Sequence, residues 1–515
     1  MSMISAFYSG KSILITGATG FMGKVLMEKL LRTSPNLKTI YILVRPKAGQ
    51  TLQERVSQIL NSKLFEKVKE TCPNVHEKIR AIYADLSKSD LAISKEDLQE
   101  LLSCTNIIFH CAATVRFDVH LRYAVQLNVI ATQQLLLMAN QMTKLEAFIH
   151  MSTAYSNCNL KHIDEVIYAC PVEPKKIIDS MEWLDDSIIE EITPKLIGDL
   201  PNTYVYTKAL AEMLLQQEKG NINMAIIRPS IVGASWQEPF PGWVDNINGP
   251  TGLIIATGKG FLRCLKATPK AVADLVPVDT VVNLTLAVGW YTALHRPKSP
   301  LIYHCTSGTI NPCNWGKMGL QILETLQKIP FEKAFRQPNA NYTSNKLLSK
   351  YWNAVSHRAP AILYDFYLQL TGRKPKMTKL MNRLLKTIAL TEYFINHSWE
   401  WSTYNTEMLM FELSPEDQKI FNFDMRPLNW LEYIENYVLG IKMYLLKEDI
   451  AAIPEAKQHN KRLRNIHYLL NTVFCLIIWR FLIARSQMAR NVWFFIVSLC
   501  YKFLSYFRAS STLKV

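Results

Sequence analysis

The sequence has no Cys-x-x-Cys pair, although ten cysteines are spread over its 515 residues. A structural zinc site needs about four ligands close together. Cys158 and His162 form the only spacing that hints at a pair of metal ligands. We therefore expect no metal site, and we expect the cysteines to be free, buried thiols in a reducing compartment.

An N-terminal secretory pattern and a nucleic-acid-binding motif are also missing. The first ten residues, MSMISAFYSG, contain neither a charged start nor a long apolar stretch, so no signal peptide is expected. Acidic residues are in the minority, since 58 Lys and Arg oppose 43 Asp and Glu and give a net charge of +15. This charge suits anionic partners. We assign it to nucleotide phosphates and to membrane lipid, and we expect no nucleic acid as a partner.

The segment from Lys11 to Gly23, KSILITGATGFMG, joins an apolar strand to a helix through three glycines. Gly17 permits a sharp turn, Gly20 lets backbone N–H groups approach a pyrophosphate, and Gly23 lets the helix pack closely on the strand. The phosphates then lie at the helix N-terminus, where free amides and the helix dipole favour negative charge. We expect the residues between these glycines to contact a dinucleotide as well: Thr19, Phe21 and Met22. The alternative is a glycine turn between ordinary elements.

The end of the second predicted strand, residues 39–44, indicates which nicotinamide cofactor binds. Enzymes that use NAD generally place Asp or Glu there to bind the ribose 2′-hydroxyl. This chain has Arg45, Pro46 and Lys47 instead. Two cations cannot accept a hydrogen bond from a hydroxyl, but they neutralise a 2′-phosphate well. The sequence therefore predicts NADPH, with incidental charges at a solvated strand end as the alternative.

The catalytic residues are predicted where a later strand ends and a helix follows. Residues 147–151 form an apolar strand that leads into Ser152 and Thr153, and Tyr204 and Lys208 lie four residues apart, on one helix face. A tyrosine is a poor acid or base at neutral pH unless a nearby cation favours its phenolate. Lys208 is that cation, and it can also hold the nicotinamide ribose. Tyr-x-x-x-Lys alone is common; after a glycine turn and a strand-end Ser-Thr it is far more specific.

The Gly-x-x-Gly-x-x-Gly spacing resembles the extended short-chain dehydrogenase/reductase superfamily. The resemblance implies that Asp85 and Leu86 contact the adenine and that Pro229 lies beside the nicotinamide. Ala112 and Ala113 leave room for the ribose and nicotinamide, and Asn128 takes the position of an asparagine in the proton relay. Strands and helices alternate through Pro229, which predicts an α/β fold with a doubly wound parallel sheet.

Several segments together resemble the fatty acyl-CoA reductase family: TGATGFMGKVLMEKLLR, HCAATVRF, HMSTAYSN, YTKALAE and RPSIVGASWQEPFPGWVDN. The resemblance spans nearly the whole chain. It implies NADPH-dependent reduction of long-chain saturated acyl-CoA, of about 16 to 18 carbons, to a primary alcohol in two hydride transfers, which feeds wax ester and ether lipid synthesis. Thr153 would bind the oxyanion, Tyr204 would protonate it, Lys208 would tune Tyr204, and Asn128 would link Lys208 to solvent. Thr153 stands where Ser is more usual, which leaves open whether Ser152 or Thr153 acts.

Two rival functions remain at this point. One is a membrane hydroxysteroid dehydrogenase or another extended short-chain reductase, which would share Tyr204 and Lys208. The other is a non-enzymatic scaffold that binds NADP. The interval of 51 positions between Thr153 and Tyr204 (204 minus 153) argues against the first. The joint presence of hydroxyl, Tyr and Lys argues against the second.

The domain plan has three parts. Residues 1–350 form an NADP-binding reductase domain, with substrate-side segments at 159–200 and 233–330. Residues 351–450 form a helical domain whose aromatic residues are expected mainly in its core. The second substrate-side segment contains basic residues with two possible roles, contact with coenzyme A phosphates or ordinary surface: Lys259, Arg263, Lys266 and Lys270.

Residues 466–507 form a membrane anchor, with a span at 466–484 and a second segment at 492–507. The basic flanks mildly favour a hairpin. We expect anchoring in the peroxisomal membrane with the catalytic domain in the cytosol, or alternatively in the endoplasmic reticulum. The oligomeric state is not predicted.

Overall fold

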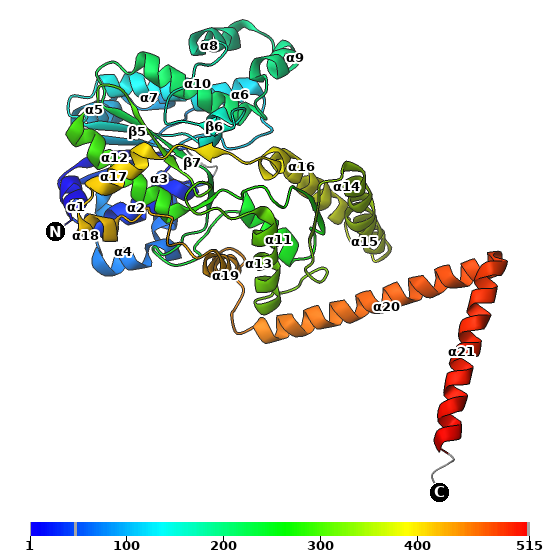
Figure 1. Cartoon of the computed structure of the whole chain (residues 1–515). Coiled ribbons are helices and arrows are strands. Elements are labelled where there is room, and N and C mark those ends of the chain that lie inside the picture. Colours follow the sequence, from blue (N-terminus) through cyan, green and yellow to red (C-terminus); the bar gives the residue numbers. More distant parts are fainter. Residues whose placement is uncertain (1, 46–48, 512–515) are drawn as a thin grey trace.

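The computed structural model describes residues 2–45 and 49–511, and its centre is a parallel sheet of seven strands (Figure 1). The strand order is β11-β7-β5-β4-β1-β2-β3. The bounds are β1 Ser12–Thr16, β2 Thr39–Val44, β3 Ile79–Tyr83, β4 Ile107–His110, β5 Ala147–Met151, β7 Met224–Pro229 and β11 Leu301–Cys305. The predicted doubly wound α/β sheet is confirmed. Its short apolar strands are typical of a sheet that is covered on both faces.

Helices cover both faces of this sheet. Side chains alternate along β1, so that Ile13 and Ile15 join one core cluster and Leu14 joins the other. The first cluster includes α2 (Phe21–Thr33) and α12 (Val278–His295), and the second includes α7 (Ala131–Asn140) and α10 (Thr203–Glu218). Smaller helices complete the unit: α1 Met3–Tyr8, α3 Leu52–Leu60, α4 Glu66–Thr71, α5 Lys95–Cys104 and α6 Leu121–Val125.

The segments predicted on the substrate side form short elements, except that residues 233–330 also contain α12 and β11, which belong to the sheet and its covering layer. Residues 159–200 contain β6 (His162–Ile163), α8 (Pro174–Trp183) and α9 (Asp186–Ile197). The later elements are β8 Ile231–Gly233, α11 Pro250–Gly258, β9 Cys264–Lys266, β10 Leu275–Pro277, α13 Trp315–Lys328 and β12 Asn341–Thr343. Strand β8 pairs with β10, and β9 pairs with β12.

The C-terminal region is helical, as predicted, but much of it packs on the reductase unit. Strand β13 (Glu400–Trp401) pairs with β6, and Asp417 of α18 (Pro415–Ile420) accepts hydrogen bonds from Ser2 Oγ and the N–H of Ile4, at the start of α1. Helix α17 (Tyr404–Glu412) and helix α19 (Trp430–Gly440) lie against β11 and α13. In contrast, α14 (Lys346–Trp352), a π-helical segment (Asn353–Arg358), α15 (Ala359–Leu370) and α16 (Met377–Asn396) extend away from the sheet (Figure 1).

The predicted aromatic core of this region is only partly correct. Trp399, Trp401 and Tyr437 are buried, but Trp352 is 38% and Tyr367 is 56% exposed. The helical pattern identified an apolar stripe. It did not show which side of the helix faces the protein.

Two long helices end the described chain: α20 (Ile453–Arg485) and α21 (Gln487–Ser511). They include the predicted span at 466–484 and the second segment at 492–507. Within the described residues, α20 alone is long and apolar enough to cross a membrane, with a mean hydropathy of 1.7 over an 18-residue window. Helix α20 extends away from the folded body (Figure 1).

Candidate functional site

The glycine turn after β1 is packed so tightly that side chains would not fit at two of its positions. Gly17 has a φ of +73°, and a Cβ there would lie 2.8 Å from the backbone nitrogen of Ala112. A Cβ on Gly23 would lie 2.3 Å from the carbonyl oxygen of Gly17. Gly20 caps α2 without a side-chain hydrogen bond and is exposed. The turn thus brings Gly17, Gly23 and Ala112 together and leaves the start of α2 open to a ligand.

A loop that sequence reasoning did not place at this turn closes over it. Trp243 stacks on Phe21, with ring centroids 5.5 Å apart and an interplanar angle of 11°. Asp245 forms an ion pair with Lys24, in the first turn of α2. Both residues belong to the segment QEPFPGWVDN, which the sequence placed on the substrate side within residues 233–330. The structure therefore adds Trp243, Asp245 and Lys24 to the residues around the turn.

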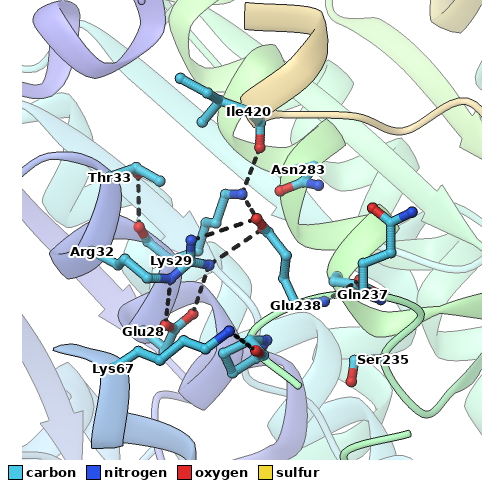
Figure 2. A network of polar contacts seen from close by, with 12 residues as sticks. Glu28, Lys29, Arg32, Thr33, Lys67, Ser235, Gln237, Glu238, Asn283 and Ile420 are labelled. Carbon is cyan, nitrogen blue, oxygen red and sulfur yellow. Dashed lines mark hydrogen bonds and ion pairs between the residues drawn. The ribbon is translucent and has the colours of Figure 1, made fainter. Parts of the chain in front are cut away.

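Buried charges hold this loop in place, as Figure 2 shows. The Glu238 carboxylate forms ion pairs with Lys29 and Arg32 of α2, and Lys29 also donates to the carbonyl of Ile420 at 2.6 Å. Asp279 of α12 accepts hydrogen bonds from three successive N–H groups, of residues 236, 237 and 238, at 2.8 to 3.0 Å. These contacts attach the loop that contains Glu238 to α2, to α12 and to the C-terminal region.

A basic groove of about 500 Å³ lies beside the turn. Its lining includes Thr19, Trp243 and Tyr444 together with four cations: Lys24, Arg55, Lys63 and Lys447. Arg45 lies at the end of β2, where its carbonyl accepts a hydrogen bond from Arg55. The predicted Lys47 lies outside the described residues.

Asp85, at the end of β3, is close to Arg45. Burial alone would raise the pKa of Asp85, but hydrogen bonds from Ser87 and the charge of Arg45 hold that pKa below its usual value. Asp85 is thus ionised at neutral pH. The predicted adenine-contacting pair, Asp85 and Leu86, follows β3 at the carboxyl edge of the sheet, where ligands bind in such folds.

Thr153, Tyr204 and Lys208 come together at the end of β5. Thr153 follows this strand in an extended conformation, and its hydroxyl is near enough to the phenol of Tyr204 on α10 to affect the pKa of that phenol. Burial raises the pKa of Tyr204 to about 12, although Thr153 acts in the opposite direction. Tyr204 is therefore a neutral phenol that can donate a proton at neutral pH.

Lys208 is fully enclosed, and its ammonium donates to the carbonyl of Met151 at 2.7 Å. Desolvation lowers the pKa of Lys208 to about 8, against the opposing effects of Cys111 and Glu212. The sequence suggested that Lys208 favours the phenolate of Tyr204. In this arrangement burial has the larger effect, and it raises the pKa of Tyr204.

Ser152 lies in a different environment from Thr153. Its hydroxyl donates to Glu212, which also accepts from Arg228 Nε at 3.0 Å and from Arg228 Nη2 at 2.6 Å. Arg228 is fully buried, and it also donates to the carbonyls of Asp164 and Val166. Pro229 follows Arg228 at the end of β7 and is buried as well. The Ser152 hydroxyl therefore belongs to a buried ion pair, and the Thr153 hydroxyl belongs to Tyr204.

Asn128 occupies a π-helical turn (Gln126–Ile130), a feature that is frequent at functional sites. Its side chain accepts from the N–H of Thr114 at 2.9 Å and donates to the Thr207 hydroxyl at 2.9 Å. Asn128 thereby joins the chain after β4 to α10, one residue from Lys208.

Aromatic side chains extend from Tyr204 toward α16. The ring of Phe117 lies 5.6 Å from that of Tyr204 and 5.5 Å from that of Phe394 in α16. Tyr155 contacts the Phe394 ring at 5.0 Å. Tyr204 is thus connected to the C-terminal region through the aromatic ring of Phe117.

Three of the basic residues considered for coenzyme A have protein partners. Lys259 pairs with Glu448 at 2.6 Å, Lys266 pairs with Glu392, and Arg263 donates to the carbonyl of Gln337 at 2.7 Å. These contacts tie residues 259–266 to other parts of the chain. They favour a structural role.

Comparisons with known proteins cover the whole chain. Residues 15–285 and residues 356–448 match two family models that are both described as male sterility protein. The chain is 81% identical over 515 residues to fatty acyl-CoA reductase 2 of Bos taurus and of Homo sapiens, and 59% identical over 514 residues to fatty acyl-CoA reductase 1 of Homo sapiens. Each alignment covers 100% of both chains.

Solved structures share the fold at low identity. The terminal R domain of the myxalamid PKS-NRPS pathway has a TM-score of 0.56 and 19% identity, covering 86% of this chain and 93% of that one. The reductase domain of a nonribosomal peptide synthetase from Mycobacterium tuberculosis has a TM-score of 0.55 and 18% identity, covering 84% and 92%. At these identities the likeness concerns the fold alone.

Proposed function

The chain belongs to the fatty acyl-CoA reductase family of oxidoreductases, and from this premise we propose that it reduces long-chain acyl-CoA to a primary alcohol with NADPH. The observation that carries the proposal is the placement of Thr153, directly after β5, next to Tyr204 of α10, with Lys208 buried at the end of the same strand. The chain also keeps the tight glycine turn that a dinucleotide requires.

The residues at the turn fit a dinucleotide. A bound nicotinamide dinucleotide supplies the hydride for each reduction step. The start of α2, from Gly20, would hold the pyrophosphate, and Gly17 and Ala112 would leave space for the ribose. Arg45, Arg55 and Lys24 supply positive charge near the 2′-position, which supports NADPH over NADH. The predicted Lys47 would add to this charge.

The catalytic residues act on the carbonyl oxygen of the substrate. Thr153 donates a hydrogen bond to the developing oxyanion, and Tyr204 transfers its proton, which suits a phenol whose pKa is about 12 because an alkoxide is more basic than a phenolate. In the thioester step, the oxyanion collapses and expels the coenzyme A thiolate. In the aldehyde step, the protonated oxygen becomes the alcohol. Lys208 would hold the nicotinamide ribose, and Asn128 would position α10 behind it.

The other predicted contacts complete the cofactor site. Asp85 and Leu86 would bound the adenine, Thr19, Phe21 and Met22 would line the phosphates, and Ala113 and Pro229 would lie beside the nicotinamide. The fatty alcohol that results is a substrate for wax ester and ether lipid synthesis.

Purified protein incubated with NADPH or NADH and a panel of acyl-CoA chain lengths tests the proposal, with products identified by mass spectrometry. Fatty alcohol is expected, with a clear preference for NADPH, and Arg45→Asp should erode that preference by about 1.5–3 kcal/mol. Equal use of both cofactors by the unmodified enzyme would refute the role of Arg45.

Substitutions at the catalytic residues test their roles. Tyr204→Phe and Lys208→Ala are expected to abolish turnover in folded protein, because they remove the proton donor and the ribose contact. Thr153→Ala should lower kcat by about 10²–10³-fold, as loss of an oxyanion donor does. Ser152→Ala should leave kcat largely unchanged and lower the melting temperature. Full activity of Tyr204→Phe would show that another group supplies the proton.

We place the protein in a membrane through α20, with the catalytic body in the cytosol, where NADPH and acyl-CoA are available. The peroxisomal membrane is our first assignment, and the endoplasmic reticulum is the alternative. The basic flanks mildly favour a return of the chain to the cytosolic side, but among the described helices only α20 is long and apolar enough to cross. Deletion of residues 465–515 is expected to release a soluble, active protein. A deletion variant that stays membrane-bound even at high salt, which screens peripheral attachment through basic residues, would place the anchor elsewhere.

A further inference from the structure

The α14–α15 arm, which includes the π-helical segment Asn353–Arg358 between the two helices, buries few apolar side chains. Its buried residues are Ser349, His357, Ala361, Asp365 and Leu368. His357 accepts from the backbone N–H of Arg263 at 2.9 Å, and Asp365 caps α16 by accepting from three N–H groups at 2.8 to 2.9 Å. Polar contacts therefore contribute much of what holds the arm on the protein, and Ala361 and Leu368 are the only buried apolar side chains among its described residues.

Most apolar residues of the arm face outward. At 3.6 residues per turn, five side chains of α15 fall within an arc of about 140°, and each is at least 56% exposed. We call these residues the outer face: Ile362, Leu363, Phe366, Tyr367 and Leu370. Helix α14 extends it with Leu347 and Tyr351, which are 76% and 55% exposed. Soluble monomers rarely expose contiguous apolar surface of this kind without a binding function.

Positive charge surrounds the outer face. Between residues 346 and 386 the chain has nine basic residues and one acidic residue, the buried Asp365. All nine basic residues are exposed: Lys346, Lys350, Arg358, Arg373, Lys374, Lys376, Lys379, Arg383 and Lys386. An apolar surface bordered by Lys and Arg is the pattern of a segment that lies in the interface of an anionic membrane.

The position of the arm agrees with this pattern. In Figure 1, α14 and α15 project from the same side of the body as α20, the one described helix that could cross a membrane. If α20 crosses a bilayer, that bilayer lies on the same side of the body as α14 and α15. The charge and the shared direction together favour a lipid surface over a second copy of the chain, since two arms that each carry nine exposed cations would repel one another.

We propose that the outer face of α15, with the adjoining residues of α14, docks into the headgroup region of the bilayer that α20 anchors, where its basic border binds anionic lipids. The arm then forms a second, peripheral attachment of the catalytic body to the membrane. Helix α16, which has 20 residues and is roughly 30 Å long, connects this attachment to the aromatic rings beside Tyr204. The arm therefore links the membrane to the site of the acyl-CoA reduction, a consequence that rests on that proposed function.

Photocrosslinking of the full chain in nanodiscs tests the docking without relying on activity. A benzophenone analogue of phenylalanine replaces Phe366, and in a matched control it replaces Leu137, which is 55% exposed on α7. In bilayers of phosphatidylcholine with phosphatidylserine, we expect lipid adducts at position 366 and none at position 137. Retained circular dichroism and melting temperature show that both proteins are folded.

The other outcomes contradict the proposal. Adducts between two chains at position 366 would assign the face to a second copy, and absence of any adduct would leave the face in water. The yield at position 366 should fall several-fold in pure phosphatidylcholine, and an equal yield would refute the role of the basic border. In a second variant, Phe366→Glu combined with Leu370→Glu should allow a water-soluble quencher to reach Trp352. The double control Leu137→Glu with Leu294→Glu should not.

Discussion

Replacement of Glu212 by Gln is expected to destabilise the protein and to change its pH profile at the same time. Glu212 and Arg228 are at most 1% exposed, and their two contacts measure 2.6 and 3.0 Å. Removing one partner of such a buried pair costs about 3–5 kcal/mol. Because Gln keeps one acceptor oxygen, the lower end of that range, about 3 kcal/mol, is expected.

The second effect concerns Lys208, whose pKa of about 8 is held up in part by the charge of Glu212. With that charge removed, the pKa of Lys208 falls further, and the ammonium loses its proton at lower pH. The alkaline decline of kcat/KM should therefore begin at lower pH in Glu212→Gln than in the unmodified enzyme. A variant that lost only packing would not shift the profile.

Thermal unfolding and the pH dependence of kcat/KM measure the two effects. A destabilisation of 1 kcal/mol lowers the melting temperature by about 2–4 °C in a domain of 150–250 residues and by less in a larger unit, so a fall of about 5 °C is expected. The control is Glu146→Gln, since Glu146 pairs with Lys11 near the surface, where such pairs contribute about 0–1 kcal/mol. Equal melting temperatures for the two variants, or an unshifted pH profile, would refute this reasoning.

Three further predictions concern the cofactor site. In the unmodified enzyme, kcat/KM for NADPH should decline as the pH rises through about 8, because Lys208 then loses its charge; a level profile would contradict this. Gly23→Ala should abolish NADPH binding, measured by calorimetry, because its Cβ would lie 2.3 Å from a backbone carbonyl oxygen. The control variant Gly372→Ala should still bind NADPH, because a Cβ there meets no atom within 4 Å. Trp243→Ala should weaken NADPH binding about twofold to tenfold by loss of the stack on Phe21, with kcat unchanged; unchanged affinity would show that the loop has no role.

The strands of the sheet could largely be predicted from the sequence. Residues 39–44 and 147–151 are strands with the expected bounds, because buried parallel strands read as largely apolar runs. Strand β11 was missed. It contains His304, whose polar ring is satisfied only in the fold, by Arg228 and by the carbonyl of Ser402.

The loop over the glycine turn could not be predicted. Glu238 lies 209 positions from Lys29, and three N–H groups of the loop reach Asp279 more than 40 positions away. Such contacts leave no local periodicity in a single sequence. The orientation of α15 was misjudged for a related reason: the helical period shows where apolar residues gather, but the partners of Asp365 and His357 decide which side faces the protein.

The order of the two hydroxyl residues after β5 supports our proposal that Thr153, and not Ser152, is the hydroxyl that acts with Tyr204. Successive residues of an extended chain point to opposite sides, and Thr153 is extended, with φ of −149° and ψ of 144°. Ser152 therefore points to Glu212 and Arg228, and Thr153 points to Tyr204. The two side chains cannot exchange roles unless the strand shifts by one residue, and such a shift would reverse every buried side chain of β5. A Ser152 hydroxyl could not replace that of Thr153, because the same geometry that positions the acid also holds Ser152 in the ion pair.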